Sequence, residues 1–331
     1  MHTMKKTRKR DVLFFGVILL LVIVMIYSGL QVLESTVLDY NVENQEPTIK
    51  RKTIERDGVE YFPRQDVTVV MVLGIDQYGP VKSSDSYRNT GSADSVMLLV
   101  FDETEENCTV LYLNRDTMVD MDMLGLWGEK IGTTRGQLAL AHTYGTGLED
   151  SCENVKNTLM NFLHGLTVDY YVAMNMDAIP ILNDAVGGVT VTVTEDFSKV
   201  NPTITMGEMT LRGEQVLDYV QTRKDVGDQK NVTRMQRQRE YVDAFLKVLY
   251  EKAETDASFL ISAYEEVSPY IVTDCSVNTL TAMLDRYADF TIASAVTPEG
   301  ENLVVDGHYQ FHVDEEKLDA LILEIFYRPK N

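Results

Sequence analysis

The sequence predicts an α/β protein in which a mixed β-sheet is sandwiched between α-helices (α-β-α), with one N-terminal transmembrane helix. From residue 66 to about residue 250, short β-branched runs alternate with segments of helical period, as in a sheet covered by helices on both faces. Residues 12–30 carry no charge, which predicts the membrane span. The chain has 331 residues, 44% of them hydrophobic, so it can bury a large core.

The N-terminal apolar stretch has the length of a membrane-spanning helix. Its nineteen residues, which are apolar on all sides, would span about 28 Å as a helix. A cleaved signal peptide would have a shorter apolar region and a small-x-small cleavage site, and SGLQVLESTV offers no clear one. Five cations precede the stretch: Lys5, Lys6, Arg8, Lys9 and Arg10. The positive-inside rule therefore predicts a cytoplasmic tail at 1–11, a transmembrane helix at 12–31 and an extracellular remainder.

The exported part divides into a stalk and one large domain. Residues 32–65 are polar and lack apolar periodicity, which is typical of a linker. Residues 66–331 form the expected extracellular domain, with core motifs over 66–250 and a C-terminal extension over 251–331. A net charge of −21 argues against nucleic-acid binding. Three cysteines are too few for a disulfide scaffold; one bridge is possible, and three unpaired, mostly buried thiols are favoured.

The domain is expected to open with three strands, at 67–76, 95–102 and 109–116, the last two joined by a hairpin turn. A helix is expected at 134–145. The next helix, at 149–165, has Asp150 and Glu153 as a capping box and Gly165 as its C′ residue. The remaining expected elements are a strand at 168–175, helices at 177–188, 211–222 and from 232, a strand at 189–193, and a final helix, strand and helix at 278–290, 302–313 and 314–327.

Charged residues stand at the ends of the early strands. Asp76 ends the first strand, and Arg115 and Asp116 end the third. In open α/β sheets, ligands bind beyond the carboxyl ends of strands. If the second strand runs antiparallel to the first, Asp94 reaches the same edge as Asp76. Two carboxylates there suit Mg²⁺; the alternative is that Asp94 only ends a turn.

Residues 221–242 concentrate six cations among three carboxylates, either as a solvated helix surface or as a site for an external anion. In the helix from Val232, Met235, Val242, Leu246 and Leu249 form the expected core stripe. Arg234, Gln238, Tyr241 and Phe245 form a second stripe beside it. Arg234 then lies near the helix N-terminus, which favours an anion. Arg237 and Arg239 are expected to be solvated. Together with Arg115 and Arg223, Arg234 would suit a pyrophosphate.

Several ordered blocks resemble the LytR–CpsA–Psr family of membrane-anchored cell-wall glycopolymer transferases. They are LGID (73–76), SADSVMLLV (92–100), NRDT (114–117), VDYYVAMNMD (168–177), LNDAVGGVTVTV (182–193) and TRKDVGDQKNVTRMQRQ (222–238). The resemblance covers roughly residues 65–250 and the C-terminal part more loosely. It implies Mg²⁺-dependent transfer of a glycan polymer (teichoic-acid-like, capsular or secondary wall polysaccharide) from a polyprenyl pyrophosphate carrier to peptidoglycan, at the membrane of a Gram-positive bacterium. The carrier chain would lie in a tunnel between the sheet and its helices.

The resemblance also implies residue roles. Asp76 and Asp94 would hold Mg²⁺, and Arg115, Arg223 and Arg234 would bind the pyrophosphate. Gln238 would assist them, and Asp228 would position the arginines or the metal. The implied enzyme is a phosphotransferase or glycopolymer ligase. In the implied reaction an acceptor hydroxyl attacks the anomeric carbon, polyprenyl pyrophosphate leaves, and Asp76 accepts the proton. Arg115 and Asp76 are the expected catalytic residues.

The sequence departs from the family pattern in three places. Ser92 and Ala93 stand where an arginine usually precedes the second aspartate, and Gln221 replaces one arginine of an R-x-R pair. The spacing between Asp228 and Arg234 is also longer than usual. Arg88 is a candidate to replace a lost charge. These departures leave open two other functions: hydrolysis of the lipid pyrophosphate, or non-catalytic binding of a lipid-linked glycan. A purely structural role would leave the arginines unexplained.

Overall fold

The computed structural model describes residues 53–330, apart from residues 57, 223, 228–230, 256, 277, 278, 280, 281, 284, 285, 288 and 289. The described part forms two compact units. We call them the sheet unit (53–175, 272–275 and 290–330) and the helical unit (176–271 and 276–287). The expected tail and transmembrane helix (1–31) lie outside the described residues. Among the residues that are described, no helix is long and apolar enough to cross a bilayer.

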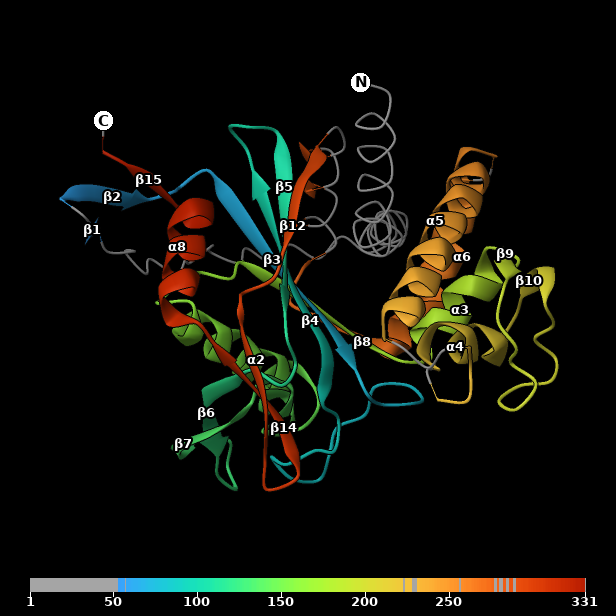
Figure 1. Ribbon diagram of the computed structural model, residues 1–331, viewed down its shortest axis with the longest axis horizontal. Coiled ribbons are helices and arrows are strands. Elements are labelled where there is room, and N and C mark those ends of the chain that lie inside the picture. The colour runs from blue at the N-terminus through green and yellow to red at the C-terminus, as the bar shows by residue number, and fades with distance from the viewer. Residues whose placement is uncertain are drawn as a thin grey trace, which may run out of the picture. The chain divides into compact units, whose positions relative to one another are not determined.

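The sheet unit is built on a six-stranded sheet in the order β11-β8-β3-β4-β5-β12. Figure 1 labels the strands of this sheet apart from β11. Strand β3 (Val67–Ile75) pairs antiparallel with β4 (Ala93–Asp102) and parallel with β8 (Tyr170–Asn175). β4 pairs antiparallel with β5 (Asn107–Leu113), and β12 (Thr291–Val296) pairs parallel with β5. The outer strand β11 spans Ile271–Thr273. Both pairing directions occur in one sheet, so the predicted mixed α/β class is confirmed.

Helices α2 (Glu149–Phe162) and α8 (Glu315–Phe326) pack on one face of this sheet. The alternation of β3 directs Val69, Met71 and Leu73 toward them. Side chains of the opposite face, such as Val70 and Val72, are also buried. The short apolar runs that predicted β3 and β4 therefore reflect burial on both faces.

Smaller strands complete the sheet unit. Strands β1 (Ile54–Arg56) and β2 (Val59–Pro63) form a sheet with β15 (Tyr327–Pro329), although residues 54–63 fall within the stretch expected to be a linker. Strands β6 (Met118–Leu124) and β7 (Lys130–Gln137) form a hairpin, followed by the 3₁₀-helix η1 (Leu138–Thr143). The final hairpin consists of β13 (Gly300–Val305) and β14 (His308–Val313).

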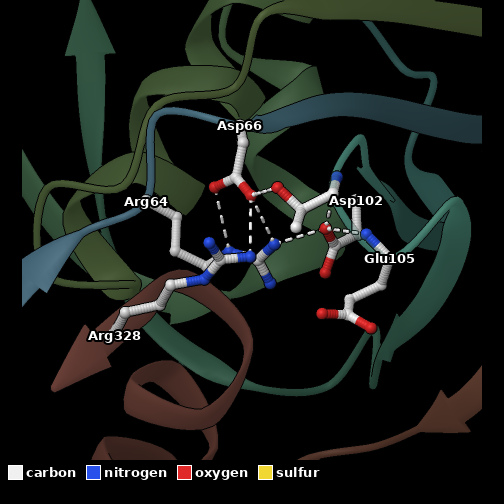
Figure 2. Close-up of polar contacts among 6 residues, drawn as sticks. Arg64, Asp66, Asp102, Glu105 and Arg328 are labelled. Carbon is white, nitrogen blue, oxygen red and sulfur yellow. Dashed lines mark hydrogen bonds and ion pairs between the residues drawn. The ribbon is translucent and has the colours of Figure 1, made fainter.

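An ion-pair cluster links the start of β3 to the C-terminal strand (Figure 2). Arg64 pairs with both Asp66 and Asp102, and Arg328 Nη2 lies 2.8 Å from Asp66 Oδ2. Hydrogen bonding from Arg64, reinforced by Thr104, holds the pKa of Asp66 well below its usual range. The cluster lies at the opposite end of β3 from Asp76.

Three local predictions are wrong. The helix expected at 134–145 is instead the end of β7 followed by η1, because Thr134 and its neighbours pair with β6. The single strand expected at 302–313 is a hairpin, since Asp306 and Gly307 both have positive φ, as a two-residue I′ turn requires. Asp150 lies inside α2 rather than capping it, and its carboxylate accepts from Thr146 N at 2.7 Å and Thr146 Oγ1 at 2.6 Å.

The helical unit consists of a hairpin and a group of helices. The hairpin is formed by β9 (Val189–Val193) and β10 (Gly207–Leu211). The helices are α3 (Ala178–Ala185), α4 (Glu214–Gln221), α5 (Asn231–Thr255), α6 (Ala257–Val267) and the 3₁₀-turn η2 (Ser268–Tyr270). Two aromatic pairs contribute to its core: Phe197 stacks on Tyr219 with 5.6 Å between ring centroids, and Tyr241 stacks on Phe245 with 6.2 Å. The expected helix at 278–290 falls partly on residues outside the described set.

Candidate functional site

Asp76 follows β3, Asp94 lies near the start of β4 and Arg115 follows β5, so the three residues lie at the same edge of the sheet. The backbone N–H of Asp76 donates to Ser92 O at 2.9 Å, which places Asp76 beside the start of β4. Continuing the β4–β5 register beyond Val96↔Leu113 puts Arg115 opposite Asp94. The antiparallel arrangement on which the predicted site depended is therefore present.

A β-bulge directs Asp94 toward this edge. Gly74 pairs with Ser95 and Ile75 pairs with Ala93, so Asp94 is the extra residue on β4. Ala93 remains fully buried in the core, while Asp94 is only half-buried. Bulges commonly re-aim a side chain next to a functional site. The alternative reading, in which Asp94 only ends a turn, does not account for its place within a strand.

The Asp94 carboxylate is held from two sides. Arg115 Nη1 forms an ion pair with Asp94 Oδ2, and Ser92 Oγ donates to Asp94 Oδ1 at 2.8 Å. In the family pattern that the sequence resembles, an arginine usually stands shortly before this aspartate. Here the hydroxyl of Ser92 contacts the carboxylate instead. Arg115 remains 41% exposed at its side chain, so an anion from solvent can reach its guanidinium.

The turn that carries Arg115 is fixed by several hydrogen bonds. Asn114 accepts from Asp116 N through its side chain at 2.9 Å and from Thr117 N through its backbone carbonyl at 3.0 Å. Ala139 N donates to Arg115 O at 3.0 Å, and Gln137 Nε2 donates to Asp116 Oδ1 at 2.8 Å. The guanidinium therefore extends from a rigid backbone, which limits the cost of ordering it around a ligand.

The helical unit carries the other predicted arginine-rich segment. In α5, Arg234 and Gln238 are half-buried, whereas Tyr241 and Phe245 are buried, so this stripe does adjoin the core. Gln238 Nε2 donates to Val220 O, at the end of α4, at 2.9 Å. Arg223 and Asp228 lie outside the described residues, as do the side chains of Met235, Val242, Leu246 and Arg239.

The expectation that Arg237 is solvated is wrong. Its side chain is 5% exposed and pairs with Glu195. Arg237 Nε donates to Tyr219 O at 3.1 Å, and Nη2 donates to Thr222 O. Arg237 thus holds the C-terminal carbonyls of α4, just before Arg223. A helical wheel cannot reveal this role, because Glu195 is 42 positions away in the chain.

A polar cavity of about 310 Å³ lies beside Asp76, and sequence reasoning missed it. Ile75 and Gln77, the residues on either side of Asp76, line it, as does Asn175 at the end of β8. Most of the remaining lining comes from the loop 77–92, which has no hydrophobic periodicity. The positively charged residues of this loop are the only sequence feature that could have indicated the cavity.

The described residues contain no group of three or more His, Cys, Asp or Glu side chains that could hold a metal by themselves. Mg²⁺ commonly takes one or two protein carboxylates and completes its shell with water and substrate phosphate. Asp76 and Asp94 at one edge fit such a partial shell. The three cysteines are free and buried, as favoured from the sequence.

Comparison with known proteins identifies the class to which this fold and site belong. The LytR_cpsA_psr family model matches residues 32–325, and the chain belongs to this family.

A relative from Enterococcus faecalis, named polyisoprenyl-teichoic acid–peptidoglycan teichoic acid transferase TagU, is 26% identical over 97% of this chain and 98% of its own. A protein of the same name from Halalkalibacterium halodurans is 28% identical over 72% of each chain. The solved structure of TagT bound to LI-WTA has a TM-score of 0.56 at 22% identity, covering 87% of this chain and 98% of that one. This structural likeness shows the shared fold.

Proposed function

We propose that this protein transfers a glycan polymer from a polyprenyl pyrophosphate carrier to peptidoglycan. The observation that carries the proposal is the Asp94–Arg115 pair beside Asp76, at the carboxyl ends of β3 and β5. The names of the relatives, which specify polyisoprenyl-linked teichoic acid and peptidoglycan, support the choice of substrates. The polymer is of the teichoic-acid-like, capsular or secondary wall class.

We further propose that the protein is anchored by residues 12–31, with its N-terminus in the cytoplasm and residues after 31 outside. This placement rests on the charge-free stretch and the five preceding cations. It puts the site on the side of the membrane where peptidoglycan lies. Protease protection of an N-terminal tag in intact cells, together with cleavage of the extracellular domain, would establish the orientation.

The site is suited to attack at phosphorus. Arg115 can grip phosphate oxygens through two parallel N–H groups, and Mg²⁺ held by Asp76 and Asp94 would stabilise charge that develops on them. Cleavage at an anomeric carbon usually uses two carboxylates that flank the glycosidic bond, whereas Asp94 here is held by Arg115. Of the two descriptions that the family resemblance implies, a phosphotransferase and an attack at the anomeric carbon, we therefore favour the phosphotransferase reaction.

In this reaction the acceptor hydroxyl oxygen forms a bond to the phosphorus next to the sugar. The bond from that phosphorus to the bridging oxygen breaks, and its electron pair leaves with polyprenyl phosphate. Asp76 is exposed and follows β3 directly, so it can accept the hydroxyl proton. From the family resemblance alone, we propose that Arg115, Arg223 and Arg234 bind the pyrophosphate charge. Gln238 would assist them, and Asp228 would position the arginines or the metal.

The test uses the full-length chain in detergent with a polyprenyl pyrophosphate-linked glycan and a soluble peptidoglycan fragment, with and without Mg²⁺. We expect acceptor-dependent and Mg²⁺-dependent release of polyprenyl phosphate, measured by mass spectrometry. Arg115→Ala should lower turnover about 10²–10³-fold. Arg135→Ala is the matched control, because Arg135 is also an exposed arginine paired with an aspartate.

Each alternative gives a different result. Release of polyprenyl pyrophosphate would indicate anomeric attack, and release without acceptor would indicate hydrolysis. Tight binding without release would indicate a receptor for lipid-linked glycan. Equal turnover in the two arginine variants would refute the assignment of Arg115.

A further inference from the structure

The cavity beside Asp76 carries positive charge without an acidic lining. Lys82 and Arg88 line it, and no Asp or Glu does. Within the described part of the chain, neither cation forms an ion pair; the Arg88 guanidinium instead lies over the Tyr144 ring, 3.8 Å from its centroid. In a protein of net charge −21, two cations facing the same cavity require a reason.

The third basic side chain of the lining does not contribute charge at neutral pH. His142 is 2% exposed, and burial lowers its pKa. Its Nδ1 lies 2.8 Å from Gly91 O, so it serves the loop backbone. The positive charge of the cavity therefore comes from Lys82 and Arg88.

The loop that presents these cations is held in place. Asn89 Nδ2 donates to His142 O at 2.8 Å and Gly145 O at 3.1 Å, and Asn89 Oδ1 accepts from Gly91 N at 2.7 Å. Ser84 N donates to Thr146 O at 2.7 Å. An anchored loop presents its cations at low entropic cost, which favours ligand binding.

The rest of the lining suits a sugar. Gln77, Ser83 and Thr90 offer amide and hydroxyl groups, and Tyr78 contributes a ring that is 62% exposed. A cavity of about 310 Å³ is at the lower end of the roughly 300–1,000 Å³ range for small-ligand pockets. An exposed aromatic ring next to polar groups can pack against the apolar face of a pyranose.

We propose that this cavity binds a sugar unit that carries an anionic group, a carboxylate or a phosphate monoester, with Lys82 and Arg88 pairing with the charge. Neither Asp94 nor Arg115 lines the cavity, so this anion is distinct from the pyrophosphate of the proposed reaction. The inference deepens the proposed function and rests on it: the sugar belongs to the donor polymer or to the acceptor glycan, next to the reacting groups.

The first experiment measures binding alone, so it does not depend on turnover. N-acetylmuramic acid, N-acetylglucosamine 6-phosphate and neutral N-acetylglucosamine are titrated into the full-length chain and followed by ligand-observed NMR. We expect both anionic sugars to bind more tightly than the neutral one and to weaken with added salt. Lys82→Ala/Arg88→Ala should weaken their binding at least tenfold.

Lys330→Ala is the control, because Lys330 is also an exposed lysine but lies beside β2, outside the cavity lining, and pairs with Glu60. Circular dichroism checks that each variant is folded. Equal affinity for charged and neutral sugars, or unchanged affinity in the double variant, would overturn the proposal.

A second experiment assigns the source of the sugar. In the transfer assay, a raised KM for the peptidoglycan fragment would place the acceptor in the cavity, and a raised KM for the lipid-linked glycan would place the donor there. Unchanged KM values for both would overturn the link to the reaction. If the wild type shows no transfer at all, the proposed function fails while the binding result stands by itself.

Discussion

Replacing Arg237 by methionine is expected to destabilise the helical unit by about 3–5 kcal/mol, the cost of leaving a buried charge without its partner. The Glu195 side chain is only 10% exposed, so its carboxylate would lose its counter-ion without regaining water. The same change removes the donors to Tyr219 O and Thr222 O, each worth about 1 kcal/mol net. Methionine preserves most of the packing against Phe197, whose ring centre lies 5.1 Å from the guanidinium carbon.

Hydrogen exchange read by mass spectrometry can locate this loss. Peptides covering α4 and α5 should exchange about 10²–10⁴-fold faster, since each 1.4 kcal/mol corresponds to a factor of ten, whereas peptides from β3 should be unaffected. Lys247→Met, at an exposed position of the same helix, is the matched control. Glu195→Gln/Arg237→Met should cost less than the single change, because no charge then remains buried alone. Unchanged protection of α4 in Arg237→Met would refute the reasoning.

Three further predictions concern other parts of the molecule. Gly227→Ala should destabilise the helical unit by roughly 1–3 kcal/mol, because Gly227 has φ +51° and a Cβ there would lie 1.7 Å from Glu195 Oε1. Urea unfolding measures the loss, and a variant as stable as the wild type would contradict the prediction. The pKa of Asp66 is lower in the folded protein than in the unfolded chain, where it is about 4. The bond from Arg64 to Asp66 therefore stabilises the fold fully above about pH 4, and this stabilisation is lost as the pH falls through the lower pKa of the folded state. Asp66→Asn should therefore lower the free energy of unfolding at pH 7. The difference in unfolding free energy between wild type and variant should become smaller in strong acid, and a difference that does not change with pH would contradict this prediction. Burial raises the pKa of all three thiols, that of Cys275 to about 12. Iodoacetamide at pH 7.5 should therefore label the native protein far more slowly than the unfolded protein. Equal labelling rates would show that the thiols are not buried.

The sheet and its polar edge could be predicted because their signals are local. Strands β3, β4 and β5 are short apolar runs, and the charged residues that follow β3 and β5 mark the edge where Asp94 and Arg115 meet. The bulge at Asp94 could not be predicted, because it depends on which residue of β3 faces Ala93.

Other features depend on contacts that a periodic pattern does not contain. Arg237 appeared solvated because its position on α5 lies off the core stripe, yet Glu195 and the end of α4 cover it. The polar cavity is formed by a loop without periodicity, and its shape depends on the hydrogen bonds of Asn89 to residues more than fifty positions away. The roles of Arg223 and Asp228 remain predictions from the family resemblance.

The pairing of β2 with β15 and of β5 with β12 constrains the order in which the polypeptide can fold. Lys330 contacts Glu60, 270 positions earlier, and Ser294 contacts Thr109, 185 positions earlier. The sheet unit cannot be completed until residues 327–330 have been synthesised. Most of the helical unit is one continuous segment, residues 176–271, and is available much sooner. Such long-range closure is slow and leaves strand edges open in the meantime, so shortening the C-terminus by even a few residues would affect how much of the protein matures as well as how stable it is.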